Sequence, residues 1–98
     1  MDPIYIEVIT SPNCPHSPKA LKIASRFVSK CKFPVIVHES SIITEEGQAM
    51  ADELSLESTP AILINGRLTF VGVPTSDELR GAVMEAKAKE HDRNTYFF

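Results

Sequence analysis

The sequence lacks the features that mark several functional classes. It has no run of basic residues and a net charge of −3, so nucleic-acid binding is not expected as its main role. No apolar run approaches the roughly 20 residues of a membrane span, and we expect no membrane association. The first residues show no basic segment followed by an apolar one, so no signal peptide is expected.

Cysteine is also scarce. Two cysteines in 98 residues do not make a disulfide scaffold, and the expected compartment is the reducing cytoplasm. The spacing of Cys14, Cys31, His38 and His91 does not match a metal site, so neither a metal nor a bound cofactor is predicted. Repeats, low-complexity segments and linkers are absent too, so we expect residues 1–98 to form a single domain and a monomer.

What the sequence does contain is a regular alternation of strand and helix patterns. Apolar alternation predicts a strand over Ile4–Thr10, and because both of its faces carry apolar residues, we expect an interior strand covered on both sides. A helical apolar stripe follows, from Ala20 to Cys31. The start of this helix is open: Ser17 and Pro18 suit a cap and a first residue, but a start near Pro15 is also compatible.

The middle of the chain predicts a second strand and a second helix. The β-branched run Phe33–His38 predicts the strand, and Thr44 is a good N-cap for the helix. Gly47 is expected to weaken this helix by up to about 1 kcal/mol. The buried face of the helix is expected to consist of Ala49, Met50 and Leu54.

The last third predicts a hairpin and a helix. Ala61–Ile64 and Arg67–Val71 are short strand patterns, and Asn65–Gly66 between them is the strongest short hairpin signal. Thr75 and Glu78 have the spacing of a capping box at the start of the final helix. The side chains expected to face inward from that helix are Leu79, Ala82, Val83 and Ala86.

The element order is therefore βαβαββα, which predicts an α/β fold: a four-stranded mixed sheet with helices on both faces. Both βαβ connections are expected to join parallel strands by right-handed crossovers, and the hairpin adds an antiparallel pair.

Cys14 is the strongest candidate for chemistry. It lies between the end of a strand and the start of a helix, where backbone N–H groups carry partial positive charge and stabilise a thiolate. His16 adds a second cation when it is protonated. The alternative is an inert buried thiol, but a loop of prolines and polar residues argues against burial.

Ser17 occupies the position where a dithiol enzyme carries its second cysteine. From the residues alone it is either a plain helix cap or a hydrogen-bond donor to the Cys14 thiolate. Cys31 does not replace the missing thiol, because it lies about 25 Å along a helix from Cys14 and a disulfide needs Cα atoms within about 7 Å. A packing role is expected for Cys31.

Four short segments resemble the thioredoxin superfamily. They are Cys14–Pro18 at the active-site position, Ser58–Pro60 before the third strand, Ile64–Gly66 at the hairpin and Phe70–Gly72 after it. The sequence is most similar to the small glutaredoxin-like thioredoxins and protein disulfide oxidoreductases of archaea and some bacteria. The resemblance covers roughly residues 4–86.

The resemblance implies roles for particular residues. It makes Cys14 the nucleophile, and Pro60 a cis proline that lies against the active-site loop. The backbone of Thr59 is implied to pair with an extended substrate peptide. The pair Pro15–His16 resembles the motif of DsbA-type oxidases, in which the histidine lowers the cysteine pKa. The predicted site is thus catalytic Cys14, His16 and Ser17, with Pro15, Thr59 and Pro60 binding the substrate.

Three positions depart from the family pattern. Ser17 replaces the resolving cysteine, and Val8 stands where thioredoxins keep a buried acid, so no carboxylate proton shuttle is expected. Asn13 stands where an aromatic residue often precedes the nucleophile. Whether Ser17 is natural or an engineered replacement that traps partners is open from the sequence, as is the role of the aromatic end Tyr96–Phe98, which either covers the sheet or reaches a neighbour.

The resulting hypothesis is a monothiol, glutaredoxin-like oxidoreductase of cell redox homeostasis. It would form mixed disulfides through Cys14 with disulfide-containing proteins or small mixed disulfides, and glutathione or another low-molecular-weight thiol would release them. Two alternatives remain: a redox-inactive peptide-binding module, and an iron–sulfur carrier of the monothiol glutaredoxin type. The second fits less well, since such carriers have glycine and an aromatic residue where this chain has Pro15–His16.

Overall fold

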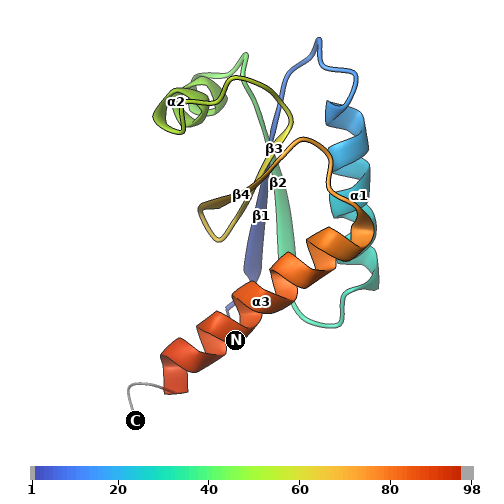
Figure 1. Ribbon diagram of the computed structural model, residues 1–98, viewed down its shortest axis with the longest axis vertical. Coiled ribbons are helices and arrows are strands. Elements are labelled where there is room, and N and C mark those ends of the chain that lie inside the picture. Colours follow the sequence, from blue (N-terminus) through green and yellow to red (C-terminus); the bar gives the residue numbers. More distant parts are fainter. Residues whose placement is uncertain (1, 96–98) are drawn as a thin grey trace.

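The computed structural model describes the backbone of residues 2–95 and the side chains of residues 2–89 (Figure 1). The predicted element order, βαβαββα, is confirmed, and so is the α/β class. The predictions about Tyr96–Phe98 lie outside the described residues. The elements are β1 (Ile4–Thr10), α1 (Ser17–Lys30), β2 (Val35–Ser41), α2 (Glu45–Glu53), β3 (Ala61–Ile64), β4 (Arg67–Val71) and α3 (Ser76–Thr95).

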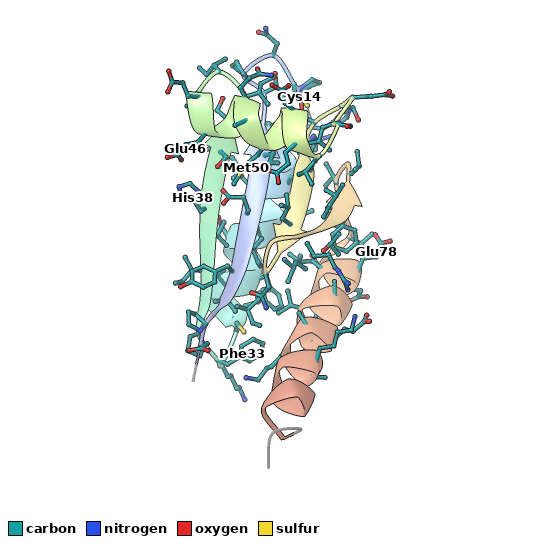
Figure 2. All side chains as sticks on the ribbon, turned by 90° about the vertical axis from the view of Figure 1, so that its left-hand side faces the viewer. Cys14, Phe33, His38, Glu46, Met50 and Glu78 are labelled. Atoms are coloured by element: carbon teal, nitrogen blue, oxygen red, sulfur yellow. The ribbon has the colours of Figure 1, made fainter. Side chains whose placement is uncertain are left out.

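The four strands form one mixed sheet in the order β2-β1-β3-β4. β1 is parallel to β2, while β3 is antiparallel to both β1 and β4. The expectation that the connection through α2 joins parallel strands is therefore wrong. α2 has only nine residues, about 13 Å, and lies across the end of the sheet (Figure 2), so it does not carry the chain back along β2, which is about 23 Å long. β3 consequently starts at the end of the sheet where β2 stops.

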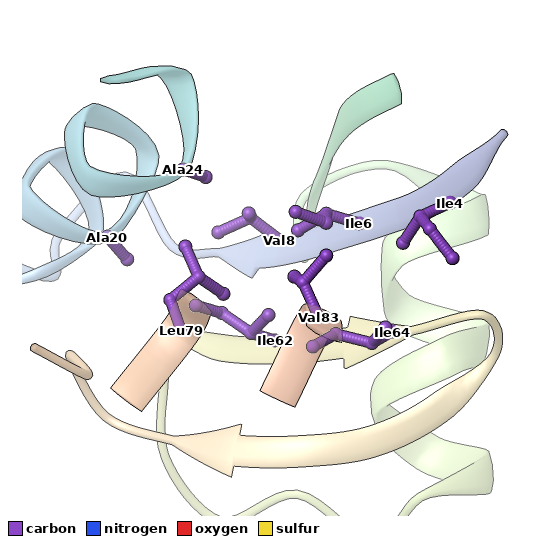
Figure 3. Packing of buried hydrophobic residues seen from close by; sticks show 9 residues of the cluster. All are labelled: Ile4, Ile6, Val8, Ala20, Ala24, Ile62, Ile64, Leu79 and Val83. Atoms are coloured by element: carbon purple, nitrogen blue, oxygen red, sulfur yellow. The ribbon is translucent and has the colours of Figure 1, made fainter. Parts of the chain in front are cut away.

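Helices cover both faces of the sheet, as predicted, but unequally. α1 and α3 pack on one face over the main core, whose residues are drawn in Figure 3. α2 covers a smaller cluster on the opposite face, around Ile9, Ala61 and Leu63. The main core comprises Ile4, Ile6, Val8, Ala20, Ala24, Ile62, Ile64, Leu79 and Val83.

The face under α2 is only partly covered, so the prediction that β1 is buried on both sides is wrong for its first half. Tyr5 is 54% exposed there. Next to it the Glu7 carboxylate bonds to the His38 ring at 2.6 Å and accepts from the Ser40 hydroxyl at 2.8 Å. The pKa of His38 is raised, and the largest cause is its hydrogen bond to the Glu7 carboxylate. This polar group spans β1 and β2, and no sequence pattern indicated it.

The second strand and second helix differ from the prediction in detail. β2 begins two residues after Phe33 and continues to Ser41, because its polar half pairs in register with residues 8–10 of β1. The Thr44 cap is confirmed, since its hydroxyl accepts from the Gly47 N–H at 3.0 Å. Ala49, expected on the buried face of α2, is exposed, whereas Met50 and Leu54 are half-buried.

Gly47 has a different role from the one expected. It is buried, and a Cβ at this position would lie less than 3.0 Å from the carbonyl carbon and oxygen of Ser41. The missing side chain therefore allows the first turn of α2 to pack against the end of β2. Gly47 is required for close packing rather than being a weak point in a helix.

The hairpin and the last helix match the prediction. Asn65 and Gly66 both have positive φ, as the tight turn between β3 and β4 requires. The capping box is present: the Glu78 carboxylate accepts from the Thr75 N–H at 2.8 Å, and the Thr75 hydroxyl accepts from the Glu78 N–H at 3.1 Å. Leu79 and Val83 are buried, and Ala82 and Ala86 are half-buried, all on the inner side of α3.

Candidate functional site

Cys14 lies in the loop between β1 and α1, at the same end of the sheet as α2 (Figure 2). Two tight turns shape this loop. The Cys14 N–H donates to the Ser11 carbonyl at 3.1 Å, and the Ser17 N–H donates to the Cys14 carbonyl at 3.3 Å. α1 begins at Ser17 with His16 as its N-cap, so Cys14 lies just outside the helix. The turn holds it close to the N–H groups of the first helical turn.

The thiol is half-buried and faces the segment before β3. Its Sγ donates to the Thr59 carbonyl oxygen at 3.2 Å, across 45 residues of sequence. The peptide bond between Thr59 and Pro60 is cis, and Pro60 is buried. The Pro60 carbonyl accepts from the Gly72 N–H at 2.7 Å, which ties this segment to the end of β4. The sheet thus holds the Thr59 carbonyl beside the thiol.

Hydrogen bonding activates the thiol. The pKa of Cys14 is lowered from 9.0 to about 7, and the largest cause is a hydrogen bond with the Ser17 side chain. The Thr59 side chain and the backbone groups of His16 and Ser17 lower the pKa further, while partial burial acts in the opposite direction. A large fraction of Cys14 is consequently thiolate near neutral pH, and the thiolate is the reactive form of cysteine.

The structure decides between the two roles that the sequence left open for Ser17, a helix cap or a hydrogen-bond donor to the Cys14 thiolate. Ser17 is the first residue of α1 and makes no capping hydrogen bond, so the cap interpretation is wrong. Its side chain is buried, and its oxygen accepts from the Ser11 N–H at 3.2 Å. That contact leaves the hydroxyl hydrogen available to donate to the Cys14 sulfur. Ser11, whose backbone N–H orients Ser17, was not among the predicted residues, because a contact made by the backbone does not depend on residue type.

Two further residues of the predicted site, Pro15 and His16, are exposed, and His16 makes no side-chain cap hydrogen bond. It lowers the Cys14 pKa through its backbone, so an effect of the imidazole stays a prediction. Cys31 is the C-cap at the far end of the 14-residue α1, about 20 Å from its start. It is therefore out of reach of Cys14.

The described part of the chain contains neither a metal-binding cluster nor a membrane-spanning helix. Among those residues, no group of three or more His, Cys, Asp or Glu side chains is arranged to hold a metal ion. Nor does any helix of that part have the length and apolar character required to cross a membrane.

Comparison with known proteins agrees with this geometry. The family profile described as the thioredoxin domain matches residues 4–84, which is most of the chain. The chain belongs to the thioredoxin family. A "Probable Thioredoxin" of Methanothermobacter thermautotrophicus is 35% identical over 80 residues, covering 82% of this chain and 92% of that protein. The "Thioredoxin" of Methanocaldococcus jannaschii is 32% identical over 83 residues, covering 85% and 95%.

A solved thioredoxin-like structure gives the same result at the level of the fold. The crystal structure of a protein disulfide oxidoreductase from Aeropyrum pernix is 36% identical with a TM-score of 0.73, and it matches 86% of this chain. This chain spans 37% of the length of that protein. The predicted resemblance to archaeal thioredoxins and protein disulfide oxidoreductases is therefore confirmed at the level of family and fold.

The role of Ser17 in the acidity of Cys14 is directly testable. In protein carrying Cys31→Ala, we expect alkylation of Cys14 by iodoacetamide to have a midpoint near pH 7. Ser17→Ala should raise that midpoint toward the free-thiol value of about 8.5, because the largest stabilising hydrogen bond is lost.

Ser29→Ala, near the far end of α1, is the matched control and should leave the midpoint unchanged. His16→Leu measures the imidazole separately and is expected to raise the midpoint less than Ser17→Ala. A wild-type midpoint at or above about 8.5 would contradict the assignment of Cys14 as an activated thiol.

Proposed function

We propose that this thioredoxin-family protein is a thiol–disulfide oxidoreductase that acts through Cys14 alone. The observation that supports this most is the combination of an acidified Cys14 with a serine at the second active-site position. The names of its relatives, thioredoxin and protein disulfide oxidoreductase, support the same chemistry.

The first step is attack of the Cys14 thiolate on a substrate disulfide. A bond forms between Sγ and one substrate sulfur, the substrate S–S bond breaks, and the leaving thiolate takes up a proton. Loss of the thiol hydrogen frees the Thr59 carbonyl, which accepts that hydrogen in the thiol form at 3.2 Å. This carbonyl then accepts a backbone N–H of an extended substrate peptide, the substrate-binding role predicted for Thr59.

The second step requires a thiol from outside the protein. The Ser17 hydroxyl has no comparable anion near neutral pH, and attack by oxygen would not yield a stable disulfide. Glutathione or another low-molecular-weight thiol attacks the mixed disulfide, leaves with the bound substrate sulfur as a new disulfide, and restores Cys14 as a thiolate. Disulfide-containing proteins and small mixed disulfides are the proposed substrates, and a reducing compartment such as the cytoplasm supplies the thiol.

Capture of a substrate tests this proposal. Reduced protein mixed with a disulfide-linked model peptide should gain the mass of one peptide half at Cys14, measured by mass spectrometry. The adduct should persist until glutathione is added. Cys14→Ala should form no adduct, and Cys31→Ala should form it as the wild type does. Absence of the adduct in wild-type protein would leave the peptide-binding module as the better account.

A further inference from the structure

The charges of this protein are segregated along the chain. Between Glu7 and Glu39 there are five basic residues and no acidic one, and between Lys32 and Arg67 there are six acidic residues and no basic one. The basic residues are Lys19, Lys22, Arg26, Lys30 and Lys32, and the acidic residues are Glu39, Glu45, Glu46, Asp52, Glu53 and Glu57.

The fold turns this segregation into two charged surfaces. The basic residues lie on α1 and just beyond its end, and five of the six acidic residues lie on α2 and the segment after it, on the opposite face of the sheet (Figure 1). The sixth, Glu39, lies on β2 beside Val8 and accepts from the Thr10 hydroxyl, on the same face as α1. All eleven side chains are exposed. The ion pairs found among the described residues involve none of them, so these charges are not neutralised within the described structure.

The two surfaces differ in how much of each lies at the Cys14 end of the sheet. Arg26 is about 14 Å along α1 from its first residue, and Lys30 and Lys32 are farther still, beyond the screening length of about 8–10 Å in physiological salt. Only Lys19 and Lys22 belong to the first turns of α1. By contrast, the whole of α2 lies at the Cys14 end of the sheet (Figure 2).

The chain segments on either side of α2 also adjoin the Cys14 loop or the end of β1. Glu57 is two residues before Thr59, whose carbonyl bonds to the thiol. The segment before α2 is held against the end of β1, because the Ile42 N–H donates to the Thr10 carbonyl at 2.8 Å. Ile43, which follows, is 75% exposed and provides an apolar contact within the acidic surroundings. Acidic side chains are therefore carried by the segments that adjoin the nucleophile.

We infer that the acidic surface formed by Glu45, Glu46, Asp52, Glu53 and Glu57 is a docking surface for the substrate protein, and that it selects disulfides flanked by lysine or arginine. This inference rests on the proposed function of Cys14 and names the class of substrate. The main causes of the Cys14 pKa shift are hydrogen bonds and burial, not neighbouring carboxylates. The acidic surface therefore acts on the approaching partner, by electrostatic steering, rather than on the thiol.

Two peptide probes of opposite charge test the inference. They have equal length and differ only in lysines or glutamates on both sides of one cysteine, which is blocked as a mixed disulfide with 2-thiopyridine. Attack by Cys14 joins the peptide sulfur to Sγ and releases thiopyridone, whose absorbance gives the second-order rate. At about 0.1 M salt, where the screening length is about 10 Å, we expect the lysine peptide to react about tenfold faster, and at about 1 M salt the two rates should converge.

Paired variants locate the effect on the surface. Glu53→Gln with Glu57→Gln should reduce the lysine-peptide advantage about threefold or more. Asp2→Asn with Glu85→Gln removes the same charge away from the Cys14 end and should leave the advantage unchanged. Glu45 and Glu46 are not used, since both stabilise the start of α2.

The outcomes separate the inference from the proposed function. Equal rates for both peptides, a ratio independent of salt, or an equal effect of the two double variants would overturn the acidic docking surface while Cys14 chemistry stands. A faster glutamate peptide would overturn it too and would assign docking to α1. If neither peptide releases thiopyridone, the proposed function fails together with the inference.

Discussion

Replacing Ser17 with cysteine is expected to convert the protein from one that captures a disulfide substrate into one that reduces it completely. Wild-type protein should release one thiol per molecule from a disulfide-linked model peptide and retain the other half on Cys14. Ser17→Cys should release both halves without any added thiol. The difference is qualitative, because it adds a chemical step that a hydroxyl does not perform.

The geometry of the loop supports this expectation. The Ser17 N–H donates to the Cys14 carbonyl in a turn, so the two Cα atoms lie within about 7 Å, the distance at which a disulfide closes. The Ser17 side chain is buried and hydrogen-bonded with the Cys14 sulfur. A cysteine there would be shielded from solvent and directed at the mixed disulfide.

The measurement is the number of thiols released per protein after excess reductant is removed, with mass spectrometry of the product. Ser17→Cys should end as an internal disulfide, two hydrogens lighter than the reduced form. Ser17→Ala is the matched control: it also loses the hydroxyl but should still stop at the adduct. Release of one thiol by all three proteins would show that this loop does not bring residues 14 and 17 together for reaction.

Much of the fold was predictable because local signals agreed with it. The capping box of Thr75, the Asn65–Gly66 turn and the Thr44 cap each use contacts within three residues, so sequence spacing alone predicts them. The direction of β3 was not predictable in this way. It depends on how α2 lies against the sheet, which is a tertiary property that the pattern of residues 45–53 does not contain.

The candidate site likewise contains residues that the sequence predicted and contacts that it did not. Cys14, Ser17 and Thr59 were predicted from residue type and from the family resemblance, and the structure places them together. The acceptor role of the Ser17 oxygen toward the Ser11 N–H was missed, because a backbone donor leaves no trace in residue identity. The Glu7–His38 pair was missed because it forms only through the register of β1 and β2.

Gly47→Ala is expected to cause a large loss of stability, about 2 kcal/mol or more in the free energy of unfolding. The added Cβ would lie under 3.0 Å from the carbonyl group of Ser41, and this neighbour is backbone, which has no rotamer to change. α2 must therefore shift away from β2 and loosen the small cluster of Ile9, Ala61 and Leu63 beneath it. Helix propensity alone predicts the opposite sign, since alanine stabilises an unconstrained helix.

Gly81 provides the control that separates the two effects. It lies in α3, is exposed, and has no atom within 4 Å of the position that a Cβ would take. Gly81→Ala should therefore stabilise the protein by about 0.5–1 kcal/mol. Urea unfolding of both variants and the wild type measures the difference. If Gly47→Ala were as stable as Gly81→Ala, α2 would not pack as closely on β2 as the structure shows, and the acidic surface it carries would be less firmly fixed beside Cys14.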